Sequence, residues 1–222
     1  MRPHVILNAA MTLDGKIATR GGDSAISSPE DLVRVHELRR EVDGIMVGIK
    51  TVLQDDPRLT VHKVPSLGKN PTRVVVDSAA RIPLKARLLG EEGKTIVAVS
   101  ERAPAARLDA LRAKAQVIVC GREVVDLKGL MERLHALGMR TLLLEGGGNL
   151  NWSMLSRGLV DEVRVAVAPR IVGGRGATTL VEGEGCERVK EGIKLELVRH
   201  YPLGRDLVLE YTVASATVAH GW

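Results

Sequence analysis

Three stretches of the sequence place glycines or short polar residues directly after a branched apolar run, where a buried strand would end. The first is LLLEGGGNLN, residues 142–151. Consecutive glycines allow a turn in which backbone N–H groups converge on an anion, and a helix opened by Asn149 would add its positive end. The stretch predicts either a phosphate-binding turn or a structural tight turn. Glu145, just before the glycines, is either a partner for a ribose or base or a solvated strand end.

The second stretch is GIKTVLQDDPRLTVH, residues 48–62. The hydroxyl of Thr51 can bind a phosphate or a ribose, and Asp55 and Asp56 are expected in a turn with Pro57. Because adjacent carboxylates in a turn usually point apart, this pair does not predict a metal site.

The third stretch is VVVDSAAR, residues 74–81. Asp77 and Ser78 follow a predicted strand, and Arg81 can grip the 2′-phosphate of a dinucleotide with its two-point fork. The alternative is that Asp77 and Ser78 only form a turn. Because all three stretches end strands, their polar residues are expected to meet at one ligand-binding edge of a sheet.

The elements that must position these residues alternate along the chain. Strands are expected at residues 4–8, 44–49, 73–76, 95–99, 116–120 and 141–144, each followed by a turn or a helical pattern. Helices are expected from Pro29, after the N-cap Ser28, over 126–138 and over 149–158. In the first helix the apolar stripe is Leu32, Val35, Leu38 and Val42.

The last third of the sequence has a different pattern. Apolar residues alternate over 162–168, 193–197 and 207–213, which predicts antiparallel strands, the last two forming a hairpin around a turn at 201–206. The predicted fold class is α/β, a mostly parallel central sheet flanked by helices with a C-terminal antiparallel hairpin. No linker divides residues 1–222, so a single domain is expected.

Composition limits the partners. The formal net charge is +5, and aromatic residues make up 2% of the chain. Scattered positive charge favours a small anionic ligand over a nucleic-acid groove, and stacking platforms for single strands are lacking. Cys120 and Cys186 have no metal-ligand spacing, so no metal is expected. No signal sequence or apolar run of membrane length is found, which predicts a cytoplasmic protein without a membrane partner.

Several motifs, in order along the chain, resemble one family. NAAMTLDGKIA, GDSAISSPED, KTVLQDDPRLTV, VVVDS and LLLEGGGNLN are similar to motifs of the reductases of riboflavin biosynthesis, especially the stand-alone archaeal and fungal type. The resemblance runs over nearly the whole chain. It implies a dihydrofolate-reductase-like fold, NADPH as hydride donor with NADH as an alternative, and a homodimer. The implied substrate is a phosphorylated pyrimidine, 2,5-diamino-6-ribosylamino-4(3H)-pyrimidinone 5′-phosphate.

The resemblance also implies site residues. Together with the reasoning above, the expected cofactor-binding residues are Thr51, Asp55, Asp77, Ser78, Ala79, Arg81, Val125, Gly147, Gly148, Asn149 and Leu150. The expected substrate-binding residues are Ser24, Arg39, Leu59, His62 and Glu145, with Arg39 as first choice for the substrate phosphate. Two positions depart from the pattern: His62 stands where arginine is common, and Asn8 stands where bacterial bifunctional relatives carry lysine.

The implied chemistry is hydride reduction of an imine at C1′ of the ribosylamino group, which needs positioning rather than a nucleophile or a metal. No catalytic residue or proton donor is assigned, and Asp14 is either a turn former or a charge near the imine. The chain lacks the zinc-deaminase signature of the bifunctional relatives, so reduction before deamination is expected. The alternatives are reduction of the deaminated pyrimidine, a pterin- or folate-type reductase, and a non-catalytic nucleotide-binding or nucleic-acid-binding protein.

Overall fold

The strands in the computed structural model, which describes residues 1–65, 68 and 70–214, form one nine-stranded sheet in the order β5-β4-β3-β2-β6-β1-β7-β9-β8. Every pair from β5 to β7 is parallel, and β9 is antiparallel to both β7 and β8. The strands are β1 His4–Thr12, β2 Gly44–Gly48, β3 Thr72–Val76, β4 Thr95–Val99, β5 Gln116–Val119, β6 Thr141–Leu144, β7 Glu162–Ala168, β8 Leu195–Leu203 and β9 Asp206–Val213.

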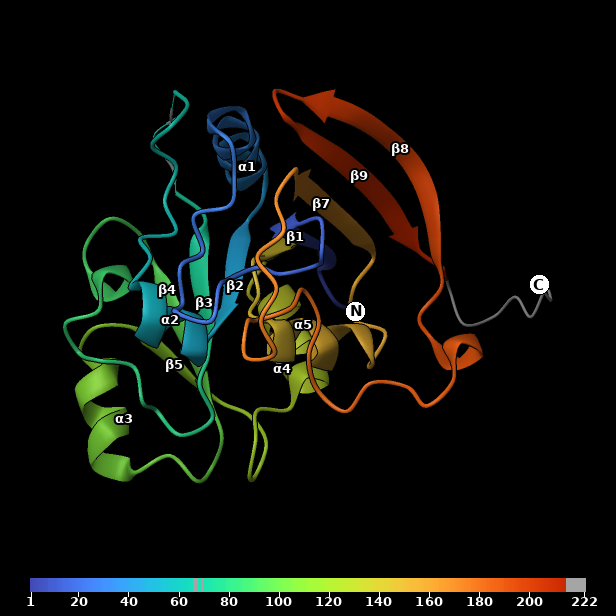
Figure 1. Cartoon of the computed structure of the whole chain (residues 1–222). Helices are drawn as coiled ribbons and strands as arrows, with labels where there is room; N and C mark the ends of the chain where they lie inside the picture. The colour runs from blue at the N-terminus through green and yellow to red at the C-terminus, as the bar shows by residue number, and fades with distance from the viewer. Residues whose placement is uncertain (66–67, 69, 215–222) are drawn as a thin grey trace.

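Helices cover both faces of the parallel part of this sheet, while the β8–β9 hairpin extends beyond them at one end (Figure 1). One core packs Leu130 of α4 and Met154 of α5 against the sheet, and the other packs Leu38 of α1 and Leu111 of α3 against the opposite face. The helices are α1 Pro29–Glu41, α2 Ile49–Asp55, α3 Ala105–Arg112, α4 Leu127–Ala136 and α5 Gly148–Leu155, with short 3₁₀ turns η1 Arg87–Leu89 and η2 Val189–Glu191.

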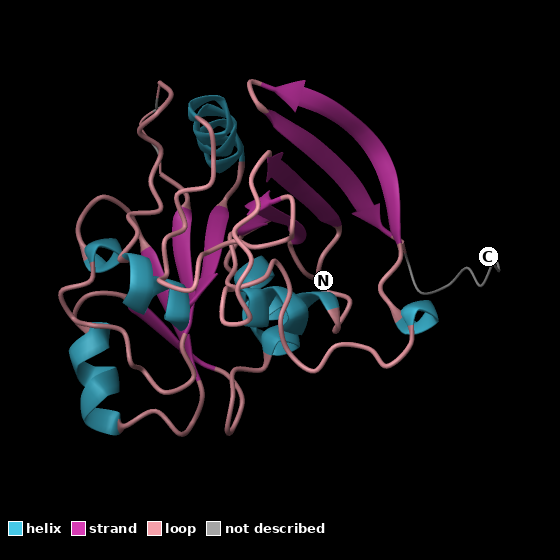
Figure 2. Ribbon diagram, viewed as in Figure 1, coloured by secondary structure: helices cyan, strands magenta, loops and turns pink. Residues whose placement is uncertain are grey.

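The hairpin confirms the predicted fold class but changes its details. β7 was expected among antiparallel strands, yet it is parallel to β1 and antiparallel only to β9, so the sheet changes direction after it. The turn expected over 201–206 is shorter, because β8 continues through Pro202 to Leu203. Proline is tolerated there because β8 is an edge strand. One side of β8 has no neighbouring strand, so the missing N–H of Pro202 need not cost a hydrogen bond between strands. Figure 2 shows this hairpin at the end of the sheet, and its turn meets the start of α1, where the N–H of Ser28 donates to Asp206 Oδ2 at 3.1 Å.

Helix α1 begins where the sequence predicted, since the Ser28 hydroxyl accepts a hydrogen bond from the N–H of Asp31 at 3.2 Å. The predicted apolar stripe is wrong in part. Leu38 is buried, but Leu32 is 37% exposed, and the buried face instead carries polar side chains, among them Arg34. That face lies against polar groups of the sheet, so the helix position depends on hydrogen bonds as well as on apolar contacts.

Two helices were not predicted. α2 has only seven residues and no side-chain cap, and its sequence was interpreted as a turn around Asp55 and Asp56. Asp56 ends this helix in the left-handed conformation, with a φ of 39°. α3 follows Pro104, whose side chain cannot accept a capping hydrogen bond at the helix start, and of its eight residues only Leu111 is buried. Neither segment has a strong enough apolar period to be recognised locally.

Candidate active site

A cleft of about 660 Å³ opens at the carboxyl ends of β1, β2 and β6. This is where parallel α/β sheets place their ligands. Most of the residues expected to bind cofactor or substrate line it, which brings together segments far apart in the sequence. They are Ser24, Arg39, Thr51, Asp55, Leu59, Arg81, Glu145, Gly147, Gly148, Asn149 and Leu150.

The glycine turn lies against the start of α2. Gly146 and Gly147 have φ values of 80° and 77°, which favour glycine at both positions. The carbonyl oxygen of Gly146 accepts from the N–H of Gly48 at 3.0 Å and from the Thr51 hydroxyl at 3.4 Å. Two of the three stretches singled out in the sequence are therefore bonded to each other.

The start of α5 differs by one residue from the prediction. Asn149 was expected to open this helix, but the helix begins at Gly148, with Gly147 as the N-cap. The change has a simple cause, because the left-handed Gly147 already ends the turn and allows helical geometry from the next residue. The N–H groups of the first turn, from Gly148 to Leu150, precede the first possible intrahelical partners and point toward the cleft end of the helix.

Arg39 and Glu145 form a two-point ion pair in the cleft wall. Arg39 Nε donates to Glu145 Oε1 at 2.7 Å, and Arg39 Nη2 donates to Oε2 at 2.6 Å. The remaining guanidinium nitrogen donates to the carbonyl oxygen of Thr60 at 3.3 Å. Burial by itself lowers the pKa of Arg39, but the charge and hydrogen bonds of Glu145 outweigh that effect and raise the pKa. The guanidinium thus has a protein partner for each of its nitrogens.

Leu59 and His62 follow α2 and differ in position. Leu59 is buried, lines the cleft and has a φ of 52°, a conformation uncommon for a bulky side chain and found most often at functional sites. His62 is exposed and lies outside the lining, with its ring centroid 4.2 Å from that of His36. Burial and then the charge of Arg39 lower the pKa of His62, which makes it a weaker cation near neutral pH than the arginine common at this position.

The remaining expected cofactor residues cluster beyond the cleft, at the ends of β3 and β5. The Asp77 carboxylate is fully buried and accepts from the N–H of Ile82 at 2.8 Å, which supports the turn interpretation of that residue. Ser78 Oγ accepts from the N–H of Val125 at 3.1 Å, so two expected cofactor positions touch. Ala79 follows in the same turn. Arg81 reaches the cleft, with its Nε 3.7 Å from Asp77 Oδ1.

The Asp14 carboxylate accepts hydrogen bonds from the end of β1 and from the segment after β7. It accepts from the Thr12 hydroxyl at 2.6 Å, from the N–H of Gly173 at 2.8 Å and from the N–H of Val172 at 3.3 Å. The Thr12 hydrogen bond is the main cause that lowers the pKa of Asp14. Asp14 does not line the cleft, so its side chain holds the loop after β1 against the segment after β7.

Part of the cleft wall comes from a segment that the sequence did not single out. We call residues Thr178–Glu182 the strap. The N–H of Ile17 donates to the carbonyl of Thr178 at 2.9 Å, and the N–H of Glu182 donates to the carbonyl of Gly148 at 3.0 Å. The strap thereby joins the loop after β1 to the start of α5. The strap has no helical or strand periodicity, so long-range contacts such as these, which the sequence does not show, determine where it lies.

The strap brings a carboxylate to the glycine turn. Glu182 lines the cleft and accepts from Asn149 Nδ2 at 2.8 Å. A negative side chain thus stands beside the end of α5 that attracts anions. Lys50 and Asn8 also line the cleft and were not among the expected binding residues.

Within the described ranges, no group of three or more histidine, cysteine, aspartate or glutamate side chains is arranged to hold a metal ion. No helix among the same residues is long and apolar enough to cross a membrane.

Comparison with known proteins agrees with this geometry. The family model of the RibD C-terminal domain matches residues 3–209. The chain is 63% identical over 214 residues to the 2,5-diamino-6-ribosylamino-4(3H)-pyrimidinone 5′-phosphate reductase of Methanothermobacter thermautotrophicus, a match that covers 96% of this chain and 99% of that relative. The chain belongs to the RibD C-terminal domain family. The resemblance to riboflavin-biosynthesis reductases expected from its motifs is confirmed, and with it the class of oxidoreductase.

Solved structures of the RibD family and of its wider fold also match. Acinetobacter baumannii RibD superposes with a TM-score of 0.83 at 26% identity, and the match covers 96% of this chain and 58% of that longer one. A dihydrofolate reductase from Enterococcus faecalis matches with a TM-score of 0.55 at 13% identity, covering 95% of each chain. The expected dihydrofolate-reductase-like fold is therefore confirmed.

Proposed function

We propose that this RibD-family chain reduces the ribosylamino group of 2,5-diamino-6-ribosylamino-4(3H)-pyrimidinone 5′-phosphate to the ribitylamino product with NADPH, as a step of riboflavin biosynthesis. The name of the Methanothermobacter relative supports the substrate. The observation that carries the proposal is the arrangement of the cleft, where the Arg39–Glu145 pair adjoins the turn formed by Gly146 and Gly147. One cleft thus offers a polar wall to a substrate beside a turn suited to a phosphate-bearing cofactor.

The residues around the glycine turn fit a dinucleotide. A Cβ on Gly147 would lie 3.2 Å from Thr51 Oγ1, so the turn keeps its backbone open at the place where Thr51 offers a hydroxyl. We propose that Thr51 and the first-turn N–H groups of Gly148 to Leu150 hold the pyrophosphate, and that Arg81 meets the 2′-phosphate. Asp55 lines the same cleft, and burial raises the pKa of its carboxyl group. When bound, the reduced nicotinamide supplies the hydride.

The adenosine end of the cofactor is assigned to the cluster beyond the cleft. Ser78, Ala79 and Val125 lie near Arg81 in the fold, and the Ser78–Val125 hydrogen bond fixes their relative position. Asp77 supports this turn from within, because its side chain is fully buried. NADH would leave Arg81 without its phosphate partner, so we expect NADPH to be the better donor.

The substrate is assigned to the side of the cleft that carries Arg39 and Glu145. The Glu145 oxygens accept from Arg39 and keep further lone pairs for a hydroxyl or amino group of the substrate. Arg39 holds that carboxylate in place, and a direct contact between Arg39 and the 5′-phosphate requires the pair to open. Ser24 on the exposed rim can donate to a phosphate or ribityl oxygen.

The apolar part of the same wall excludes water from the reacting atoms. Leu32 and Val35 of α1 and the buried Leu59 line the cleft. Apolar walls strengthen the polar contacts made inside the cleft. Positioning in such a site supplies much of the acceleration that hydride transfer needs. His62 stays a proposed substrate contact, reached from the cleft through Thr60, which accepts from Arg39 and lies 3.3 Å from the His62 ring.

We also propose a homodimer and a cytoplasmic location. The β8–β9 hairpin exposes Leu195, Leu197, Val198 and Leu207 at the end of the sheet, where a second copy would cover them. Sedimentation of the purified protein measures the oligomeric state, and a monomer across the micromolar range would contradict the dimer.

The function is tested by following NADPH oxidation at its near-ultraviolet absorbance with the diamino substrate, the deaminated substrate and dihydrofolate in parallel. We expect turnover with the diamino substrate and the ribitylamino compound as product. Turnover with dihydrofolate alone would reassign the chain to folate chemistry. Cofactor binding without oxidation in any of the three reactions would mark a non-catalytic binding protein, and a steep loss of affinity for nucleic acid with salt would mark a nucleic-acid binder.

A further inference from the structure

A second cavity, of about 590 Å³, lies at the amino ends of β2 to β6, the opposite end of the sheet from the cleft. Its volume is within the range of small-molecule sites in proteins. Among its lining residues are Asp43, Thr72, Lys94, Lys114, Gln116 and Met139. None of the described residues that line it also lines the cleft, so the proposed reduction gives this second cavity no role.

The second cavity lies where α4 ends. The helix is followed by its C-cap Leu137, and Gly138, with a φ of 92°, turns the chain toward β6. Both residues line the cavity, so α4 stops at its rim. A Cβ on Gly44 would lie 2.6 Å from Met139 Cε, which shows that Met139 fills the space beside the start of β2. The remaining space extends over the first residues of β3 to β5.

The apolar part of the lining comes from the core under α4. Ile96 of β4 and Met139 are 4% and 6% exposed, and both belong to the core that packs α4 against the sheet. Leu137 is 55% exposed at the rim. A flat apolar ring that enters the cavity would cover these side chains, and removing apolar surface from water stabilises a complex.

Two exposed lysines in the lining have no partner within the described ranges. Lys94 is two residues before Ile96, and its carbonyl oxygen accepts from the N–H of Arg73 at 2.9 Å, so it extends β4 with its side chain on the face that α4 covers. Lys114 comes from the turn between α3 and β5. Neither lysine side chain forms a hydrogen bond or an ion pair with residues 1–65, 68 or 70–214.

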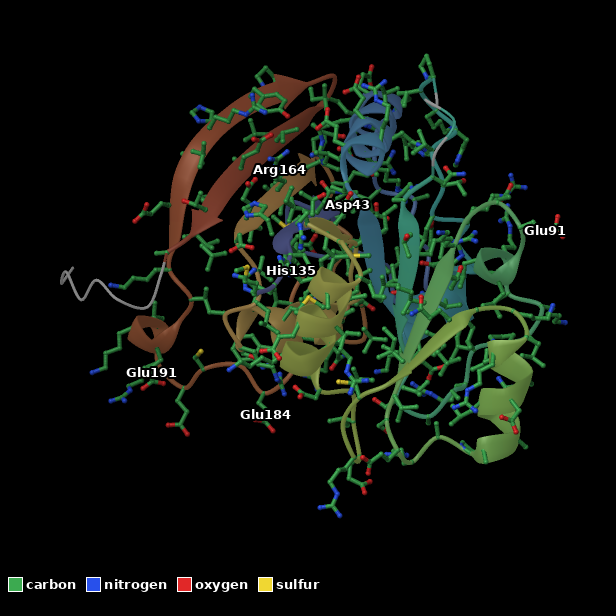
Figure 3. The ribbon with its side chains drawn as sticks, turned by 180° about the vertical axis from the view of Figure 1, so that it is seen from behind. Asp43, Glu91, His135, Arg164, Glu184 and Glu191 are labelled. Carbon is green, nitrogen blue, oxygen red and sulfur yellow. The ribbon has the colours of Figure 1, made fainter. Side chains whose placement is uncertain are left out.

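Asp43 is the acid among the described lining residues, and its carboxylate is bonded to the start of β6. Its Oδ2 accepts from the N–H of Arg140 at 2.8 Å and from both the N–H and the hydroxyl of Thr141 at 3.0 Å. Arg140 also donates to the ring of His135 on α4, and Figure 3 shows Asp43 and His135 on the same side of the molecule. These donors offset the negative charge of Asp43, so the two lysines are the groups that can meet a negative ligand.

We propose that the second cavity binds a phosphate monoester of a flat apolar ring, with the phosphate between Lys94 and Lys114 and the ring against the apolar part of the lining. A phosphate monoester carries a charge of about −1.5 to −2 near pH 7, which two lysine cations balance. The hydroxyl of Thr72 and the amide of Gln116 can donate to further phosphate oxygens. This site is separate from the cleft and does not depend on the proposed function.

The test uses 1-naphthyl phosphate as the probe and measures its binding to the full-length protein by calorimetry. Inorganic phosphate carries the charge without the ring, and naphthol carries the ring without the charge. The wild type should bind naphthyl phosphate about tenfold or more tightly than either. Naphthoate, which joins the same ring to a single charge, should also bind more weakly. Equal affinity for naphthyl phosphate and for any of these three compounds would contradict the proposed ligand class.

The double variant Lys94→Met with Lys114→Met locates the binding. Methionine keeps an unbranched side chain without the charge, and both positions are exposed, so stability should change little. The affinity for naphthyl phosphate should fall about tenfold or more, whereas Lys94→Arg with Lys114→Arg should keep it within about threefold. Unchanged binding in the methionine variant would place the probe elsewhere, for example in the cleft, and overturn the inference.

A matched control is Lys128→Met with Lys190→Met. Both lysines are exposed, line neither the cleft nor the second cavity and form no ion pair with the residues that the structure describes, so the variant removes the same charge at other places. It should bind naphthyl phosphate as the wild type does. Equal weakening in the two methionine variants would assign the binding to the overall charge of the protein and overturn the inference.

Thermal unfolding checks that every variant is folded before its affinity is compared. Turnover without the probe should be the same in all of them, because none of the replaced lysines lines the cleft. The proposed function is thus judged from turnover and the second cavity from binding of the probe, so that either can fail without the other.

Discussion

Arg39 and Glu145, separated by 106 positions in the chain, meet in the cleft wall through two parallel hydrogen bonds of 2.7 and 2.6 Å. Their side chains are 14% and 12% exposed. A pair this sheltered is costly to break, because the remaining partner is left as a buried charge. Both residues were expected to contact the substrate, and the structure shows that they also contact each other. Their loss should therefore affect stability and substrate use together, and the two effects need separate measurements.

Replacing Arg39 by methionine should lower the free energy of unfolding by about 3 kcal/mol, because the Glu145 carboxylate keeps its burial but loses its counter-charge. We also expect the KM for the pyrimidine substrate to rise by about tenfold or more. Urea denaturation and steady-state turnover measure the two effects. The affinity for NADPH should stay close to that of the wild type, and loss of cofactor binding in both Arg39→Met and Glu145→Gln would show that their roles are misassigned.

The double variant Arg39→Met with Glu145→Leu separates charge burial from function. With no orphaned charge, stability should recover toward the wild type, as apolar replacement of a buried ion pair often allows. Substrate turnover should stay low because the acceptor is gone. Recovered turnover would show that neither side chain contacts the substrate.

Glu182 is expected to oppose cofactor binding. Its carboxylate accepts from Asn149 Nδ2 at 2.8 Å, beside the end of α5 that we assign to the pyrophosphate. Glu182→Gln keeps the hydrogen bond and removes the negative charge, so NADPH should bind roughly two- to fivefold more tightly at low salt. Fluorescence titration of NADPH at two salt concentrations measures this, and the gain should shrink at the higher one.

The matched control is Glu184→Gln. Glu184 lies in the same connection and does not line the cleft (Figure 3), so its charge should have little effect on NADPH affinity. An equal gain in both variants would indicate a general charge effect. If NADPH affinity does not increase in Glu182→Gln, the pyrophosphate binds at a different place from the start of α5.

Much of this fold could be predicted because its signals are local. Ser28 caps α1 through its own sequence neighbour Asp31, and the glycines after β6 require a turn whatever surrounds them. The strands of the parallel sheet are short apolar runs that end at such turns. Their shared direction then brings the polar residues that follow the strands, such as Thr51 and Glu145, to one edge of the sheet.

The features that could not be predicted depend on contacts between residues that lie far apart in the sequence. The position of the strap is set by backbone hydrogen bonds with Ile17 and Gly148. These contacts bring Glu182 to the cleft. The buried polar face of α1 contradicts the apolar stripe because Asn8, far away in the chain, supplies the acceptor for Arg34. Asp77 resembled a ligand at a strand end, but its burial favours the turn that the sequence had left as an alternative.

His36 should make stability depend on pH. It is buried, and its Nδ1 accepts from the N–H of His62 at 3.0 Å. Burial and then the charge of Arg39 lower its pKa from 6.5 to about 4. Between these values the unfolded chain binds a proton that the folded protein excludes, so stability is lost as the pH falls from 6.5 toward 4. The loss attributable to His36 should be on the order of 3 kcal/mol.

His36→Asn should flatten this dependence, because the amide oxygen can replace Nδ1 as acceptor and does not titrate. Denaturation curves at intervals between pH 4 and pH 7 give the comparison. His200→Asn, on the exposed surface of β8, is the control and should keep the wild-type dependence. A wild-type slope in His36→Asn would assign the acid sensitivity to other groups.

Gly148 of the glycine turn lies directly against the strap, since its carbonyl oxygen accepts from the N–H of Glu182 at 3.0 Å. A Cβ at this position would lie 2.6 Å from the carbonyl oxygen of Thr179 and 2.7 Å from Glu182 Cγ, both too close for a real contact. Gly148→Ala should therefore force the strap away from α5, lower the free energy of unfolding by about 1–3 kcal/mol and weaken NADPH binding. Gly176→Ala is the control, since its nearest neighbour would be Arg20 Cγ at 3.8 Å, and it should change stability by less than about 0.5 kcal/mol. Equal stability and equal cofactor affinity in the two variants would mean that the strap can move without cost, and that it does not form part of the cofactor site.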